Sequence, residues 1–348
     1  MRAPPHNIES VSNFVMEGDI IESVDGLFFD VKGLVHPPDR VVAFIRYYPD
    51  SSGSRVRGGV SYKKIYNLKA RYALLRDRFP QYLIYDPVFD EYLCEVPRRD
   101  IKYLYSPRIF LRRFHERLDE LDDLERKALS LAQLIKERAG IPWNDVGVTG
   151  SVMISMHKPS SDIDLIVYGS KSCCAAYEAL TELFSDGEIE TYNEEGLKRL
   201  YHFRCKDTKM DFHDFVKVES RKKLQGVFRG VEFFIRLVKL PSEVNERYGD
   251  VLYKKAGWAR IKAEVVNAGE SIFTPCRYEV KDVNFLDGDK VTEIREIVSY
   301  RGRFCEQARE GERVIAQGKI EKVIPKSEDA YFRLILGSEA HDYMVISD

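Results

Sequence analysis

The 348-residue chain lacks several features that would assign it to a class of protein at once. No apolar run approaches the roughly eighteen residues that a membrane span requires, and the N-terminus lacks the apolar segment of a secretory signal. Its six cysteines include no C-x-x-C pair, so neither a disulfide framework nor a zinc site is indicated. We therefore expect a protein of the reducing cytoplasm with no membrane partner.

The sequence also lacks an excess of charge of either sign. It has 54 basic and 56 acidic residues and a net charge of −2. This balance argues against a protein whose entire surface binds nucleic acid, although it is compatible with local basic patches. The hydrophobic content of 44% suffices for ordinary cores. A chain of this length is expected to form two or three domains.

The most informative stretch is VGVTGSVMISMHKPSSDIDLIVYG, at residues 146–169. A short apolar run leads into Gly150 and Ser151, and Asp162 and Asp164 open a second apolar run. Because side chains alternate along a strand, the two aspartates would point to the same face. Neighbouring carboxylates repel each other unless a cation lies between them, and hard oxygen ligands suit Mg²⁺ or Mn²⁺. Gly150 would let backbone N–H groups approach an anion closely, and the Ser151 hydroxyl would add a donor.

This stretch resembles the nucleotidyltransferase superfamily typified by DNA polymerase beta. That pattern joins an apolar strand, Gly-Ser or Gly-Gly, a spacer, and Asp-x-Asp at the next strand, and it is matched by Gly150, Ser151, Asp162 and Asp164. The resemblance implies a metal-dependent enzyme with Mg²⁺ or Mn²⁺ as its cofactor. Such an enzyme transfers a nucleoside monophosphate from an NTP such as ATP to an acceptor hydroxyl and releases pyrophosphate.

The resemblance also implies a third carboxylate on a later strand of the same sheet. We predict Asp211, because residues 201–218 read as a hairpin whose returning strand holds Asp211 between two apolar residues. Asp214 remains the alternative, although its offset of three residues would turn it to the opposite face. The expected catalytic and metal-binding residues are thus Asp162, Asp164 and Asp211. The expected nucleotide-binding residues are Gly150, Ser151 and Lys158.

The chain as a whole predicts an α+β fold of three consecutive modules. Residues 1–105 read as a β-rich α+β module, and residues 106–240 as a nucleotidyltransferase core with a mixed sheet and helices. Residues 241–348 read as short strands separated by turns, which is typical of an all-β, barrel-like module. An apolar segment at 226–240 could either extend the catalytic sheet or begin the last module.

Within these modules, a hairpin is expected around Asp25-Gly26, followed by a mobile loop at 49–59 and a helix at 62–79. A single long helix is expected at 108–139, and a second helix after the Asp-x-Asp strand, at 170–184. Basic residues alternate with tyrosines in the first module. This fits either nucleic-acid binding or a solvated face over packed tyrosines.

The flanking modules bear on the acceptor. A β-rich block on each side of such a core is similar to uncharacterised archaeal proteins regarded as nucleotidyltransferases. The size of these blocks favours a large acceptor, such as tRNA or another RNA, or DNA. The alternatives are a protein-AMPylating enzyme of the antitoxin type and a non-catalytic module that binds nucleotides or nucleic acid.

Overall fold

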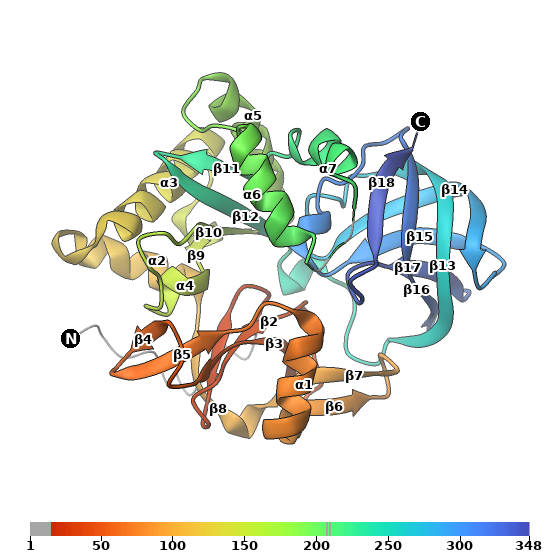
Figure 1. Cartoon of the computed structure of the whole chain (residues 1–348), viewed down its shortest axis with the longest axis horizontal. Coiled ribbons are helices and arrows are strands. Elements are labelled where there is room, and N and C mark those ends of the chain that lie inside the picture. Colours follow the sequence, from red (N-terminus) through yellow and green to blue (C-terminus); the bar gives the residue numbers. More distant parts are fainter. Residues whose placement is uncertain (1–14, 207, 209, 348) are drawn as a thin grey trace. The chain divides into compact units, whose positions relative to one another are not determined.

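The computed structural model of the chain describes residues 15–206, 208 and 210–347 (Figure 1). Within these ranges the protein is a mixed α+β fold with three sheets and seven α-helices. None of the described helices is both long enough and apolar enough to cross a membrane. All six cysteines are free thiols.

Two compact units make up the chain, and each is built from several segments. The first comprises Met1–Ile84, Leu93–Thr191 and Lys223–Asn245. The second comprises Tyr85–Tyr92, Tyr192–Lys222 and Glu246–Asp348. The units are therefore interleaved along the chain, whereas the sequence predicted three consecutive modules.

An eight-stranded sheet is formed by the N-terminal part of the chain. Its strands are β1 (Ile20–Ser23), β2 (Phe28–Val31), β3 (Arg40–Pro49), β4 (Arg55–Arg57), β5 (Val60–Lys64), β6 (Leu83–Asp86), β7 (Glu91–Pro97) and β8 (Ile101–Tyr105). The antiparallel pairing of β1 with β2 confirms the hairpin around Asp25-Gly26. Helix α1 (Leu68–Arg78) buries Leu75 in the core on one side of this sheet.

Two predictions for this sheet are wrong. The loop expected at 49–59 contains β4, which pairs with β5. Residues 62–64 lie in β5 rather than in a helix, because β5 is held by β3 on one edge and by β4 on the other. The helix begins later, at Leu68, where the side chain of Asn67 accepts a hydrogen bond from the backbone N–H of Ala70.

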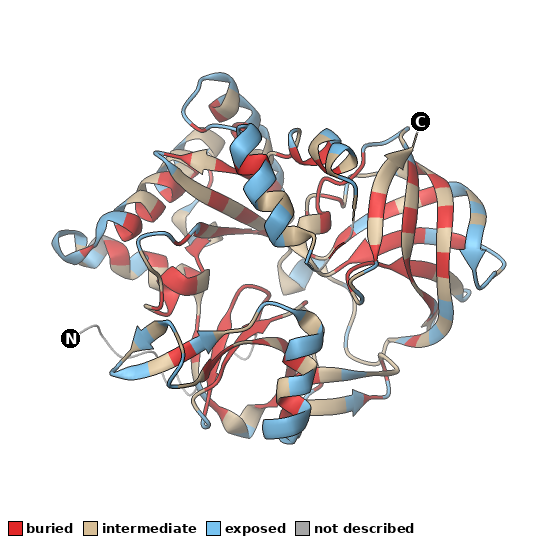
Figure 2. Ribbon diagram, in the orientation of Figure 1, coloured by how far each residue is buried: buried red, intermediate tan, exposed pale blue. Residues whose placement is uncertain are grey.

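A second sheet of the first unit has the strand order β11-β12-β10-β9. Its strands are β9 (Val146–Val148), β10 (Ile163–Tyr168), β11 (Gln225–Phe228) and β12 (Val231–Val238). Strand β10 is antiparallel to β9 and parallel to β12, so the segment at 226–240 extends this sheet. Helices α3 (Asp123–Ala139) and α5 (Ser170–Ser185) pack against β10, which is buried along almost its whole length (Figure 2).

The helix expected at 108–139 is in fact two helices. Helix α2 (Pro107–Glu116) ends before a short 3₁₀ turn, and α3 starts after Asp122. Asp122 and Glu125 form a capping box, in which each side chain accepts a hydrogen bond from the other residue's backbone N–H, at 3.0 and 3.1 Å. The capping box starts a new helix here, whereas the apolar spacing had suggested one continuous helix.

The second unit contains the six-stranded C-terminal sheet. Its strands are β13 (Val251–Asn267), β14 (Cys276–Gly288), β15 (Ile294–Ser299), β16 (Arg313–Pro325), β17 (Tyr331–Ile335) and β18 (Tyr343–Ser347). The succession of strands predicted within 241–348 is confirmed, although β13, β14 and β16 are longer than the short strands expected. The hairpin predicted at 201–218 is wrong, because its described residues lie largely in helices α6 (Glu194–Arg204) and α7 (Phe212–Glu219). Asn193 and Asp211 cap these helices.

Candidate metal and nucleotide site

Asp162 directly precedes β10, and Asp164 is the second residue of that strand. The intervening Ile163 is buried, whereas Asp162 is exposed and Asp164 is half-buried. The alternation expected from the sequence thus places both carboxylates on one face of the strand. This face, which we call the carboxylate face, continues on the neighbouring strand β12.

Burial raises the pKa of Asp164 to about 7, and the charge of Asp162 contributes in the same direction. Lys64, Arg236 and Arg46 oppose this shift. Near neutral pH, in the absence of a bound cation, Asp164 is therefore partly protonated, and the pair carries less than two negative charges. A divalent cation would displace this proton and remove the repulsion between the two carboxylates, so the donor set fits Mg²⁺ or Mn²⁺.

Gly150 lies directly against the side chain of Asp164. It begins the short helix α4 (Gly150–Met153) with a φ of +67°, and a Cβ atom at this position would lie 2.1 Å from Asp164 Oδ2. The backbone N–H of the preceding Thr149 donates to the carbonyl oxygen of Asp164 at 2.9 Å. The glycine of the Gly-Ser pair is therefore required both by backbone conformation and by the close approach of this carboxylate.

Replacing Gly150 with alanine is expected to displace the Asp164 carboxylate and to weaken Mn²⁺ binding at least about tenfold, in addition to destabilising the fold by about 1 kcal/mol. Gly187 offers a matched control, because its φ is +73° and a Cβ atom added there would meet no other atom within 4 Å. Gly187→Ala should thus reproduce the cost in stability, measured by chemical denaturation, without the loss of Mn²⁺ affinity. Equal Mn²⁺ affinities for the two variants would contradict the role assigned to Gly150.

Ser151 and Lys158 lie on the chain between β9 and β10. Ser151 is buried, and its Oγ has no hydrogen-bond partner among the described residues. The backbone N–H of Lys158 donates to Ser161 Oγ at 2.9 Å, so this part of the segment forms a tight turn. The binding of a nucleotide by the Lys158 side chain stays a prediction.

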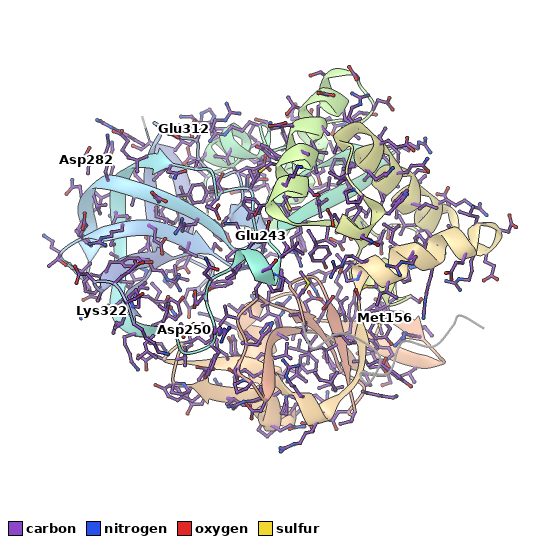
Figure 3. All side chains as sticks on the ribbon, turned by 180° about the vertical axis from the view of Figure 1, so that it is seen from behind. Met156, Glu243, Asp250, Asp282, Glu312 and Lys322 are labelled. Carbon is purple, nitrogen blue, oxygen red and sulfur yellow. The ribbon has the colours of Figure 1, made fainter. Side chains whose placement is uncertain are left out.

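The spacer between Gly150 and Asp162 is held by the N-terminal sheet. Arg55 Nη1, from β4, donates to the carbonyl oxygen of Met156 at 3.0 Å and to Ser161 Oγ at 3.1 Å (Met156 is labelled in Figure 3). Met156 also belongs to an apolar cluster with residues of the N-terminal sheet, including Phe28 and Tyr47. The N-terminal strands therefore contact the spacer that leads to Asp162.

Glu232 was not among the residues singled out from the sequence. In the parallel pairing of β10 with β12, Ile163 lies beside Phe233. One residue earlier on each strand stand Asp162 and Glu232, which are thus neighbours on the carboxylate face. Glu232 is half-buried, so the first unit offers a third carboxylate beside the pair. In the sequence, Glu232 is the one acidic residue of the apolar segment at 226–240, and nothing local indicates that it lies beside Asp162.

The chain is 32% identical to the uncharacterized protein MJ1086 of Methanocaldococcus jannaschii over 328 residues, which is 92% of this chain and 94% of that protein. The chain belongs to the MJ1086 family. The predicted similarity to archaeal proteins is supported in this form. No family model matches the chain, and no solved structure matches it.

In this MJ1086-family chain, Asp211 and Asp214 belong to the second compact unit. Asp211 is the N-cap of α7, where its Oδ1 accepts from the backbone N–H of His213 at 2.8 Å. Asp214 lies in the first turn of that helix. Both residues therefore have helical settings instead of the strand that was expected, and a role for either in metal binding stays a prediction.

A separate group of this MJ1086-family chain, Asp122, Glu125 and His157, has the composition of a metal site. One possible ligand atom of each residue lies within 4.8 Å of the others. His157 Nε2 is 2.7 Å from Asp122 Oδ2, and this contact ties the spacer before β10 to the start of α3. The hydrogen bonds within the group already give it a structural role. Because its three side chains are also possible metal ligands, it is an alternative site to the carboxylate face in any measurement of bound metal.

Proposed function

We propose that the chain is a metal-dependent nucleotidyltransferase that moves a nucleoside monophosphate from an NTP to an acceptor hydroxyl. The observation that carries this proposal is the carboxylate pair of Asp162 and Asp164, with Gly150 fitted against Asp164. In the bond-making step, the acceptor hydroxyl loses its proton to solvent and its oxygen forms a bond to the α-phosphorus, while the bond between this phosphorus and the bridging oxygen breaks. Pyrophosphate leaves with that oxygen.

The residues of the first unit fit a site for divalent cations and phosphate. Asp162 and Asp164 would hold Mg²⁺ or Mn²⁺, whose chemistry is to neutralise phosphate charge and to lower the pKa of the acceptor hydroxyl. Gly150 leaves room for the Asp164 carboxylate to remain in place. The unpartnered Ser151 hydroxyl is a donor that a phosphate oxygen would satisfy.

The third carboxylate has two candidates in this proposal. Asp211 follows from the resemblance to the superfamily, whereas Glu232 follows from strand register. The register favours Glu232, because it stands beside Asp162 on the same sheet face. Asp211 already has a role as a helix cap.

An RNA, such as tRNA, is the acceptor that we propose. Transfer to a protein side chain, as in AMPylation, is the second candidate, and both would use the same carboxylates. The proposed reaction is tested by incubating the protein with each labelled NTP, Mg²⁺ or Mn²⁺, and either total RNA or total protein. Labelled RNA is the expected product, and labelled protein would support AMPylation. No label in any acceptor despite normal Mn²⁺ binding would reject the enzyme and leave a non-catalytic binding module.

A further inference from the structure

Lys64, Arg236 and Arg46 all lower the pKa of Asp164, and they differ in what else they contact. The strand of Lys64 pairs with β4, whose Arg55 donates to Ser161 Oγ beside Asp162. Arg46 Nε is 2.7 Å from Asp30 Oδ2, so its charge is already paired within the N-terminal sheet. Arg236 Nη1 is 2.9 Å from Glu17 Oε1. Lys64 makes no ion pair with any carboxylate in the described part of the chain. Of these three cations, Lys64 is therefore the one whose charge is not already paired with another carboxylate and can bind a ligand.

Lys64 is the last residue of β5, where it pairs with Tyr47 of β3. Its Nζ lies 5.7 Å from the centroid of the Tyr47 ring and 4.7 Å from that of Tyr66. These ring faces stabilise a cation but satisfy none of the three N–H donors of an ammonium with an oxygen acceptor. Two aromatic rings thus position the Lys64 side chain, and its ammonium can still donate hydrogen bonds to a ligand.

The ammonium of Lys64 stays charged in this setting. Burial lowers its pKa, but the nearby Tyr47, Tyr66 and Asp162 outweigh this effect, so the pKa is raised overall. A charged, half-buried ammonium near Asp162 would repel a divalent cation bound to the carboxylates. The same ammonium would attract an anion bound to that cation, and this combination suits a metal-bound phosphate.

We propose that Lys64 binds the phosphate chain of the nucleotide, so that the N-terminal sheet supplies part of the nucleotide site. This inference rests on the proposed function and adds a substrate-binding residue from outside the segment that carries the Gly-Ser and Asp-x-Asp motif. The next residue back on the same strand, Lys63, is exposed and, by alternation, points to the opposite face. The two lysines therefore form a matched pair for a test.

The experiment measures equilibrium binding of ATP, AMP and adenosine with Mn²⁺, in the wild type, Lys64→Ala, Lys64→Arg and Lys63→Ala. A charge-assisted hydrogen bond is worth about 1.5–3 kcal/mol, so Lys64→Ala should bind ATP about 10–100-fold more weakly. Adenosine binding should change less than about threefold, because adenosine has no phosphate. Lys64→Arg should recover most of the ATP affinity, and Lys63→Ala should match the wild type.

Binding of Mn²⁺ alone separates this role from a structural one. Removal of a repelling charge near Asp162 should leave the Mn²⁺ affinity of Lys64→Ala unchanged or higher, whereas a damaged fold would lower it. An ATP affinity equal to that of the wild type, or an equal loss for ATP and adenosine, would overturn the inference. These readouts need no turnover, so a failure to detect transfer would reject the proposed reaction without deciding the role of Lys64.

Discussion

Asp164→Asn is expected to abolish nucleotidyl transfer and, at the same time, to stabilise the metal-free protein at pH 8. The loss of transfer should reach about a thousandfold, because the charge stabilisation supplied by a bound metal is worth several kcal/mol. The gain in stability follows from the pKa of Asp164, which burial raises from 3.8 to about 7. No side-chain hydrogen bond of Asp164 to another described residue is lost in this change.

The sign of the pH effect follows from proton binding. Between pH 4 and pH 7 the folded protein holds a proton on Asp164 that the unfolded chain has released, so the free energy of unfolding falls as the pH rises. Each pH unit is worth about 1.4 kcal/mol for a fully buried group, and the partial exposure of Asp164 reduces the expected total to roughly 2 kcal/mol. An asparagine side chain does not titrate, so the Asp164→Asn variant should gain this amount at pH 8 and nothing below pH 4.

Urea denaturation at several pH values, in the presence of a chelator, measures this difference. Asp329→Asn is a suitable control, since Asp329 is exposed and its removal changes the net charge by the same amount. A variant at position 164 that is less stable than the wild type at pH 8 would contradict the raised pKa of Asp164. When the chelator is left out, added Mn²⁺ should stabilise the wild type more than the variant.

Glu232→Gln is expected to lower transfer about a hundredfold or more, whereas Asp211→Asn should leave it within about threefold of the wild type. The reason is that Glu232 neighbours Asp162 across the β10–β12 register, so its charge can contribute to the same metal site. Asparagine is as good an N-cap as aspartate, so Asp211→Asn removes the charge and keeps the cap of α7. Transfer rates and Mn²⁺ affinities of both variants provide the measurement.

The reverse result would restore the role predicted from the sequence. A loss of transfer and of Mn²⁺ affinity for Asp211→Asn, with little effect of Glu232→Gln, would identify Asp211 as the third ligand. Thermal denaturation of both variants controls for damage to the fold.

Local spacing explains the features that could be predicted from the sequence. The hairpin around Asp25-Gly26, the helix at 170–184 and the C-terminal strands each depend on turn residues and on apolar alternation over a few positions. Gly150 and the two aspartates of β10 could be singled out for the same reason. The fit of Gly150 against the Asp164 carboxylate could not, because it requires the pairing of β9 with β10.

Long-range pairing explains the features that were missed. Residues 201–218 alternate polar and apolar side chains as a strand does, yet Tyr201 makes edge contacts with the rings of Phe212 and Phe215 within a helical pair. Glu232 becomes a neighbour of Asp162 only once β12 pairs parallel with β10. Lys64 lies in β5, about a hundred residues before Asp164, and lowers the pKa of that carboxyl. No local sequence pattern predicts that the two residues interact.

Direct counting of bound Mn²⁺ tests the central claim that Asp162 and Asp164 form a metal site. Electron paramagnetic resonance of Mn²⁺ titrated at neutral pH should detect bound ion in the wild type and in His157→Ala. The double variant Asp162→Asn/Asp164→Asn should not bind at this site, and ATP should not restore it. Retention of all bound Mn²⁺ by the double variant, together with its loss in His157→Ala, would place the metal at Asp122, Glu125 and His157 and contradict the account.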